Sequence, residues 1–458
     1  MKNRFKAAKD TALERLSFTL LFEPAKAAGG INMTRLIKYE FYKLFCKPSI
    51  LVVLILFSVI DLFKINSEFH SYSYLADGND SRSWNSVYWQ LYENYRGEIT
   101  AEKINQLLSL YQPLAHATAD RTASTAKDNP DMMTGNIYSD LNILEKYYVK
   151  PMEYFYHYQT YALQVAERAK ENAAVYRERG QTVEVRKNSA IYNLYAGRSI
   201  KTFAYEEMYN YYLNYDFSGI LVLFLCLYGV VGTFVCEKET QMDMLLLTNP
   251  NGGKKTAFAK IAAAAFFVDS VAIWFSVVDY IGFVFSFGTT EGGNLPLYAV
   301  SNFSTAAVNC NLSQYAILSA VVRAVGVWTM SMVFLLISMF WRNALVPFVA
   351  DFGIALCLII TGASQSCLSH TWLKIINPYS LLANRVLFSK TEFINLAGYP
   401  IQSFQAAIVF AITLGLVSIT AMLLLSKRNS NIFCWTVKSR RRTRGTFMSA
   451  LSNESSSH

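Results

Sequence analysis

The sequence predicts an all-α polytopic membrane protein with six transmembrane helices, an N-terminal amphipathic helix and a large, mostly helical domain between the first two spans. Three observations lead to this fold class. Of the 458 residues, 53% are hydrophobic and only 16% are charged, and the mean hydropathy of +0.21 is too high for an ordinary soluble protein of this length. Six apolar runs approach or exceed the length that crosses a bilayer. A polar insert, residues 66–214, separates the first run from the others.

The first 32 residues are basic and contain one short apolar patch, SFTLLF. A signal peptide needs an apolar core of at least about 7 residues, so we do not interpret this start as a cleaved leader. Met33 opens a segment with the character of a natural protein start. Residues 1–32 are therefore interpreted as an N-terminal extension of little functional weight, and the sequence leaves open whether it is native.

Residues 33–48 predict an amphipathic helix that lies flat on the inner face of the membrane before the chain turns inward at Pro48. One side of this helix is basic and the other is apolar, which is typical of a helix at a membrane surface. The apolar side comprises Leu36, Ile37, Phe41, Leu44 and Phe45.

The predicted spans differ in length. Span one, residues 49–65, is shorter than the roughly 20 residues that a bilayer requires. It ends near Asp61 and Lys64, which are one helical turn apart and are expected to pair. The other spans are expected at residues 215–236, 257–287, 314–340, 344–362 and 404–425, with a loop at 288–313, a segment with short helices at 363–403 and a basic tail at 426–458.

The insert is expected to be a mostly helical domain outside the membrane. Of the 29 tyrosines in the chain, 21 fall between Tyr72 and Tyr215. Tyrosines at helical spacing, such as Tyr154 and Tyr158, are expected in the core of this domain, and a ligand-lining surface is the alternative. Helices are expected near residues 84–95, 101–111 with Thr100 as the N-cap, 141–149, 153–179 and 189–212.

The distribution of basic residues predicts the orientation of the spans. Ten lysines and arginines lie in the first 47 residues and seven lie after residue 425. Lys238, Lys254 and Lys255 lie between spans two and three, on the same side of a six-span protein. The positive-inside bias places this side and both termini in the cytoplasm and the insert outside, so we expect an integral protein of a bacterial plasma membrane. The basic tail is either a solvated charge cluster or a site for anionic membrane lipid, and its charges do not indicate nucleic acid.

A charged interruption, residues 237–256, separates spans two and three. Its first half predicts a brief helix with early acidic residues and an apolar face, and a breaker with the sequence NPNGG follows. An apolar face of this size does not stay bare to water. The interruption is therefore expected to dock either on lipid headgroups or in the groove of another protein.

The order of these features resembles the membrane subunit of type-2 ABC exporters. The resemblance rests on a basic elbow helix, LIKYEFYKLF, the large insert between spans one and two, the segment EKETQMDMLLLTNPNGGKKTAFAK between spans two and three, and IINPYSLL and NLAGYPI before the last span. It covers residues 33–425. Each motif is loose, and their order with six spans makes the match specific.

The resemblance implies a permease that works with a second permease chain, identical or related, while a cytoplasmic ATP-binding subunit clasps each half. ATP and Mg would bind to that subunit, and this chain would need no cofactor of its own. In the family, the loop helix and the elbow helix touch the ATPase. The resemblance therefore implies a coupling role for Glu237, Glu239, Met242, Met244, Leu245 and Leu246, and for Leu36, Phe41, Leu44 and Phe45 in the elbow.

The chain shows no catalytic signature of its own. The sequence around Gly252-Gly253-Lys254 fails the P-loop pattern, because Thr248 stands where a glycine is needed and Lys255 where serine or threonine is needed. The histidines form no HEXXH motif and no GxSxG elbow is present, so neither a metal site nor an enzyme is expected. An alternative to transport is a sensor or mechanical transmitter, in which a partner ATPase moves the outer domain without carrying a solute.

Charged residues inside spans are costly, and each one suggests a function. They are Asp269 and Asp279 in span three, Arg323 in span four and Asp351 in span five. Asp279 and Arg323 are at similar depth on antiparallel spans, so we expect an ion pair, either a structural lock or part of a substrate relay. Asp269 lies nearer the middle of the membrane and is the candidate for lining a route or a subunit interface.

Cysteines on the outer side permit one disulfide. Cys310 and Cys367 are both expected there, where oxidising conditions prevail. We consider a bond between them as a hypothesis, and two free thiols as the alternative.

Overall fold

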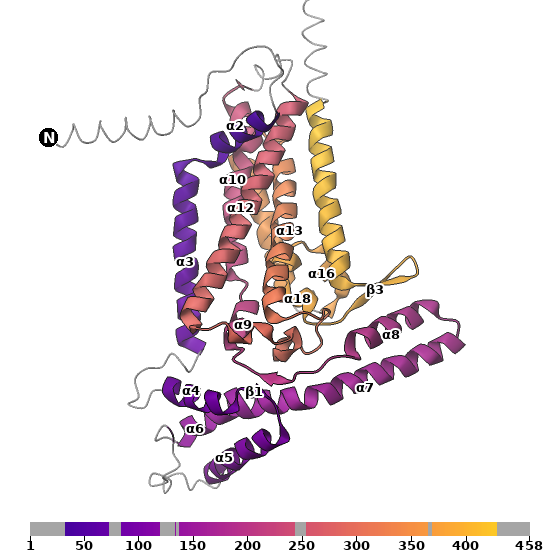
Figure 1. Ribbon diagram of the computed structural model, residues 1–458. Coiled ribbons are helices and arrows are strands. Elements are labelled where there is room, and N and C mark those ends of the chain that lie inside the picture. Colours follow the sequence, from indigo (N-terminus) through magenta and orange to yellow (C-terminus); the bar gives the residue numbers. More distant parts are fainter. Residues whose placement is uncertain are drawn as a thin grey trace, which may run out of the picture.

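The structure is a computed structural model that describes residues 33–72, 84–119, 133, 137–242, 253–364 and 369–427. Within these ranges the fold is mostly helical, and six helices are long and apolar enough to cross a membrane. Figure 1 shows these helices side by side, with the helices of the insert gathered at one end of the bundle. The predicted number of spans is therefore confirmed, and the chain has the properties of an integral membrane protein.

Each span lies close to its predicted position. The spans are α3 (Pro48–Tyr72), α10 (Phe217–Glu239) with the short helix α9 (Glu207–Leu213) before it, α12 (Lys254–Phe287), α13 (Leu312–Ser338), α14 (Leu345–Ala363) and the sixth span, Ser403–Lys427.

Span one is longer than predicted. Helix α3 has 25 residues and continues for two turns past the predicted end at residue 65. Lys64 does not pair with Asp61 as expected, but lies 2.6 Å from Glu68 one turn further along the helix. Phe69 then packs edge-on against Phe287 of α12. The polar residues that ended the apolar run therefore do not end the helix, because they pair along its surface.

The predicted amphipathic helix is present as α2 (Met33–Phe45). Its apolar face packs against α12 and α10. The Phe45 ring stacks on the Phe267 ring with their centroids 4.3 Å apart. This packing fixes α2 to the ends of α10 and α12 that lie farthest from the insert.

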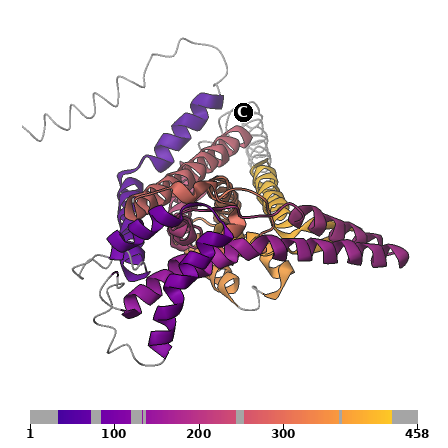
Figure 2. The same ribbon diagram turned by 60° about the horizontal axis from the view of Figure 1, so that its bottom comes forward.

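The insert is built from helices, of which α7 is the longest with 29 residues, and one small sheet. Its elements are α4 (Trp84–Tyr95), β1 (Gly97–Glu98), α5 (Ala101–Ala119), α6 (Ile137–Ile143), the π-helical turn η4 (Leu144–Val149), α7 (Lys150–Glu178), α8 (Thr182–Tyr195) and β2 (Thr202–Phe203). Thr100 caps α5 as predicted, because its hydroxyl accepts a hydrogen bond from the Lys103 N–H. Figures 1 and 2 show α7 and α8 as an arm that extends sideways beyond the spans.

One predicted helix is wrong. The expected helix over residues 189–212 is interrupted at residues 196–206, where β2 pairs antiparallel with β1. Arg198 lies in this interruption and is buried. Its guanidinium donates to the Ala306 carbonyl at 2.6 Å and to the Asn309 side chain at 2.8 Å. These partners in the loop after span three hold the chain out of a helix.

The segment after span three is folded as three short 3-10 turns, η5 (Glu291–Asn294), η6 (Leu297–Ala299) and η7 (Ser301–Phe303). The segment before the sixth span contains the expected short helices α16 (Thr371–Ile376), α17 (Tyr379–Leu382) and α18 (Arg385–Phe388). It also contains a hairpin, β3 (Phe393–Leu396) and β4 (Tyr399–Gln402). Ala397 and Gly398 form its two-residue turn with positive φ angles of 50° and 89°. The prediction of a purely helical fold is corrected by these two small sheets.

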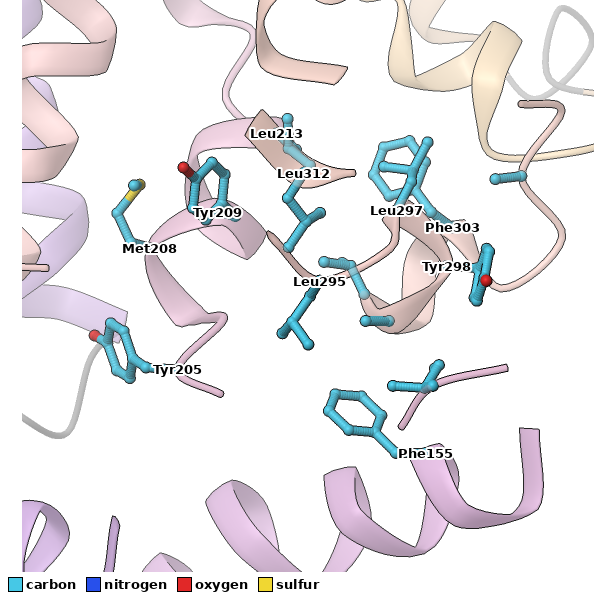
Figure 3. Packing of buried hydrophobic residues seen from close by; sticks show 14 of the residues in the cluster. Phe155, Tyr205, Met208, Tyr209, Leu213, Leu295, Leu297, Tyr298, Phe303 and Leu312 are labelled. Atoms are coloured by element: carbon cyan, nitrogen blue, oxygen red, sulfur yellow. The ribbon is translucent and has the colours of Figure 1, made fainter. Parts of the chain in front are cut away.

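The buried core of the insert continues into the loop after span three. Phe155 and Tyr158 of α7, Tyr209 of α9 and Phe303 of the loop belong to one buried cluster. Figure 3 shows the side chains of α9 and of the loop packed together, with Phe155 beneath them. The expected core role of the tyrosines therefore holds for Tyr158, while Tyr154 is half-buried. The insert and the outer ends of the spans share one hydrophobic core.

Gly292 marks a close approach within this core. A Cβ atom at this position would press on the backbone carbonyl of Tyr205, which cannot rotate away. We expect Gly292→Ala to lower the free energy of unfolding by about 1–3 kcal/mol, since the packed backbone must shift. Thermal unfolding of the purified protein in detergent measures this change. Gly197→Ala is the matched control, because a Cβ there meets no atom, and equal stability of the two variants would contradict the prediction.

Candidate functional site

An ion-pair cluster lies at the end of α10, where the charged interruption begins. We call Glu40, Lys43, Glu237 and Lys260 the inner cluster. Glu237, in the last turn of α10, contacts two lysines: its Oε1 lies 2.8 Å from Lys43 Nζ of α2, and its Oε2 lies 2.6 Å from Lys260 Nζ of α12. The Lys260 side chain is only 2% exposed and also donates to the Thr233 carbonyl. One carboxylate therefore joins three helices.

Burial and neighbouring charges shift the pKa values of the two α2 residues in the inner cluster. Burial raises the pKa of Glu40, although Lys260 and Lys43 oppose this shift. Burial opposes the charge on Lys43, but its hydrogen bond to Glu237 and the nearby Glu40 carboxylate raise its pKa overall. Lys43 therefore remains charged at neutral pH. Glu40 Oε2 is buried and has no hydrogen-bond partner within the described part of the chain.

The end of α10 is also tied to the turn between spans four and five. Lys238 Nζ donates to the backbone carbonyls of Met339 and Trp341. Glu239 Oε1 accepts a hydrogen bond of 2.7 Å from the Ala344 N–H, just before α14 begins. A displacement of residues 237–239 would thus act on α2, α12, α13 and α14 together.

The residues implied in coupling are only partly described. Glu237 and Glu239 belong to α10 itself and not to a separate loop helix, which corrects the predicted boundary of span two at residue 236. Met242 is exposed. Met244, Leu245 and Leu246 lie outside the described residues.

The four elbow residues share the buried side of α2 to different degrees. Leu44 and Phe45 are buried, and Leu36 and Phe41 are half-buried. Phe41 packs on Phe45, which in turn stacks on α12. Leu44 and Phe45 belong to the buried core of the bundle and Phe41 packs against that core, so these three residues attach the elbow to the bundle.

A second buried polar cluster lies in the half of the bundle nearest the insert, which we call the outer half, and it joins four spans. It comprises Asp61, Tyr215, Ser218, Asp279 and Arg323, and we call it the outer cluster. The expected ion pair is present: Arg323 Nη1 lies 2.8 Å from Asp279 Oδ2. Ser218 Oγ donates to the same oxygen at 2.6 Å. Arg323 also donates to the Ser218 hydroxyl and to the Tyr215 carbonyl.

Sequence reasoning missed the role of Asp61. Its side chain is fully buried, and its Oδ1 accepts a hydrogen bond of 2.7 Å from the Tyr215 hydroxyl. Tyr215 links Asp61 to the rest of the cluster, because the Tyr215 carbonyl accepts a hydrogen bond from Arg323. A charged residue in the middle of an apolar run was the available signal, but its proximity to Lys64 suggested a local pair instead.

The other two intramembrane carboxylates stand apart from this cluster. Asp351 of α14 is 0% exposed, and neither of its oxygens has a hydrogen-bond partner among the described residues. Asp269 is half-buried on α12, and its side chain makes no hydrogen bond or ion pair within the part of the chain that the structure describes. The four predicted intramembrane residues therefore do not line one continuous polar route.

An apolar groove of about 460 Å³ lies on the outer half of α12 and α13. Hydroxyl groups stand at one end of it, where Tyr209 contacts both Tyr280 and Ser313. Its walls include Ile273, Val277, Ile281, Ile317 and Val321. Such a surface suits a hydrophobic molecule with a polar end.

The described residues offer little other chemistry. They contain no group of three or more metal-ligating side chains. Cys310 is half-buried, and burial raises the pKa of its thiol to about 11, against a smaller opposing effect of Arg198. Cys367 lies outside the described residues, so the proposed disulfide with Cys310 stays a prediction.

No known protein family matches the chain, and no curated protein matches it either. The functional interpretation therefore rests on the residues themselves.

Proposed function

We propose that the chain is the permease subunit of an ATP-binding cassette exporter that uses ATP hydrolysed by a separate cytoplasmic subunit. The observation that carries the proposal is the inner cluster, where Glu237 joins α2, α10 and α12 at the start of the charged interruption. The proposed ATPase contacts are Glu237, Glu239 and the apolar face of the interruption, with α2 beside them. This chain would hold no nucleotide and catalyse no reaction.

The mechanism follows from these contacts. Closure of the ATPase dimer would push the interruption, and the push would reach α2 and α12 through the two lysines that Glu237 binds. Glu239 would carry it to α14. Because a charge pair buried between helices resists separation, the helix ends would move as one body. A second permease chain, identical or related, would form the other wall of the route.

The proposed substrate class is supported by a groove on the surface of two spans. The groove on α12 and α13 is apolar with hydroxyl groups at one end. This favours a peptide, a lipid or a hydrophobic antimicrobial compound over a small ion. The basic residues of the inner side support a cytoplasmic location for both termini in a bacterial plasma membrane.

A mechanical transmitter is the second candidate, and the packing of the insert favours it. The Tyr154 and Tyr158 hydroxyls of α7 donate to the carbonyls of Tyr298 and Ser304, each at 2.7 Å. These loop residues lie between α12 and α13, so motion of the spans would pass directly to α7. The outer domain would then be the moving output, with no solute carried.

Flux separates the two functions. Inverted membrane vesicles that contain the chain and its ATPase would be given labelled hydrophobic peptides and lipids, with a hydrolysis-dead ATPase as the control. ATP-dependent accumulation supports the exporter. Movement of a spectroscopic probe on α7 with ATP, without accumulation of any substrate, supports the transmitter.

Replacing Leu245 and Leu246 with Asp is expected to uncouple the permease from its ATPase. Two charges would remove the apolar surface that the interruption offers to its partner, while the spans keep their packing. We expect normal membrane insertion and at least a tenfold loss of ATPase in copurification, since two buried leucines contribute a few kcal/mol, about 1.4 kcal/mol per tenfold. Leu110→Asp with Leu163→Asp, at exposed positions of the insert, is the matched control. Undiminished copurification of the first variant would refute the docking assignment.

A further inference from the structure

The charges of the outer cluster do not balance if all of its ionisable side chains are ionised. Asp61, Asp279 and Arg323 are 0%, 1% and 9% exposed, so water does not solvate them freely. If both carboxyl groups are ionised, two negative charges face one positive charge. An uncompensated charge in a buried, low-dielectric place is strongly unfavourable. The cluster therefore needs one more positive charge.

The hydrogen bonds leave two acceptors open in the same place. Asp61 Oδ1 accepts from Tyr215, and Asp279 Oδ2 accepts from Ser218 and Arg323. The remaining oxygens, Asp61 Oδ2 and Asp279 Oδ1, are both buried and both lack a partner within the described residues. Each carboxyl group thus has one satisfied and one unsatisfied oxygen.

We propose that Asp61 and Asp279 share one proton near neutral pH, and that this proton fastens span one to spans two, three and four. Tyr215 connects the two carboxyl groups, because its hydroxyl donates to Asp61 and its carbonyl accepts from Arg323, which pairs with Asp279. A proton on either of the two open oxygens gives that carboxyl group an O–H donor, and the other group is its acceptor. One proton then satisfies both open oxygens and leaves the cluster neutral.

The neighbouring charged groups do not supply this positive charge. Arg323 is already used by Asp279, and Lys64 on α3 pairs with Glu68. Asp216, at the start of α10, pairs with Arg385. The titratable groups that face the cluster are Tyr215 and Glu68 near Asp61, and Tyr212 and Asp216 near Arg323. None of these brings a further cation to the two open oxygens.

The consequence is a joint that depends on pH. Span one packs loosely, because only 22% of its apolar window is buried in the protein, against 72%, 44% and 56% for spans two, three and four, which it meets at the outer cluster. Loss of the proton in alkaline solution would leave two adjacent carboxylates beside one guanidinium, and their repulsion would push α3 away from α12. Stability should therefore be full while the proton is held and should fall as the pH rises.

Asp61→Asn is the test variant, because it imitates the protonated state. The amide oxygen can accept from Tyr215, and the amide N–H can donate to Asp279. Infrared difference spectra of the full chain in lipid, wild type minus variant near neutral pH, should contain the carbonyl stretching band of a protonated carboxyl group, and the band should shift in D2O. Asp269→Asn is the matched control and should leave this band in place.

Thermal stability is the second measurement, and it compares the wild type with Asp61→Asn. The melting temperature of the wild type should fall in alkaline buffer, and that of Asp61→Asn should fall less. If Asp61→Asn does not fold, the band must still disappear from the wild type on alkaline titration. A difference spectrum without a protonated carboxyl band, or an infrared spectrum of the wild type that is unchanged up to the pH at which it unfolds, overturns the proposal.

Discussion

Replacing Arg323 with Met is expected to lower the free energy of unfolding by about 3–5 kcal/mol, because the change leaves Asp279 buried without its cation. Asp279 is 1% exposed, and its remaining donor would be the Ser218 hydroxyl. The Tyr215 carbonyl would also lose the guanidinium N–H that it accepts. Since these groups come from α10, α12 and α13, the loss should affect the packing of the whole outer half. Thermal or denaturant unfolding in detergent measures it.

The double variant Asp279→Leu with Arg323→Met distinguishes the cost of an unpaired buried charge from the cost of altered side-chain packing. Removing both charges leaves no uncompensated ion from this pair, so the double variant should recover more than half of the stability that Arg323→Met loses. Arg342→Met, in the turn between α13 and α14, serves as a control for the loss of an arginine outside the cluster. Additive losses in the double variant would mean that the pair does not act as a unit.

The spans could be predicted from the sequence because the signal is local. An apolar run of sufficient length must cross the membrane as a helix, since backbone groups in lipid have no other partner. The ion pair of Asp279 and Arg323 followed from the same reasoning, because antiparallel spans place residues at equal depth. Depth alone does not determine which face of a helix a residue occupies, and Asp269 shares α12 with Asp279 but lies apart from the cluster.

The contacts that the sequence did not predict are distant along the chain. Asp61 and Tyr215 are 154 residues apart, and no pattern in either segment points to the other. The break in the helix near Arg198 likewise depends on Ala306, 108 residues away. Gly197, directly before Arg198, was a local sign of the break, because glycine disfavours the interior of a helix. Tertiary hydrogen bonds override helix propensity at this position.

The two polar clusters lie near opposite ends of the same helices. The inner cluster joins α10 and α12 to α2, and the outer cluster joins them to α3 and α13. Between them, the contact of α10 with α12 includes a close approach in which a Cβ on Gly229 would collide with the Phe267 ring. Helices that are fixed at both ends and packed tightly between them move as a rigid pair. A force applied at Glu237 would therefore arrive at the outer cluster.

Glu237→Gln is expected to break both ion pairs of the inner cluster and to lower the free energy of unfolding substantially. The amide keeps the shape of the side chain but removes the charge that balances Lys43 and Lys260. Lys260 is buried, so the variant should lose about 3 kcal/mol of stability and release α2 from α10. Unfolding curves measure the stability. ATP-dependent transport at a temperature where the variant is folded measures whether the connection is needed for coupling.

Glu40→Gln is the matched control for that prediction, because it removes a carboxylate from the same cluster without removing the charge pairs of Glu237. Burial raises the pKa of Glu40, and its Oε2 has no hydrogen-bond partner among the described residues. Its Oε2 lies 3.9 Å from Lys43 Nζ, a longer contact than the two ion pairs of Glu237 at 2.8 and 2.6 Å, so the neutral amide should cost less than the change at Glu237. If the two variants lose equal stability, net charge near Lys260 matters and the bridging geometry of Glu237 does not. A second outcome is that only Glu237→Gln is destabilised but still transports normally. The ion pairs of Glu237 then stabilise the fold without carrying the coupling, and the ATPase acts on the spans through another contact.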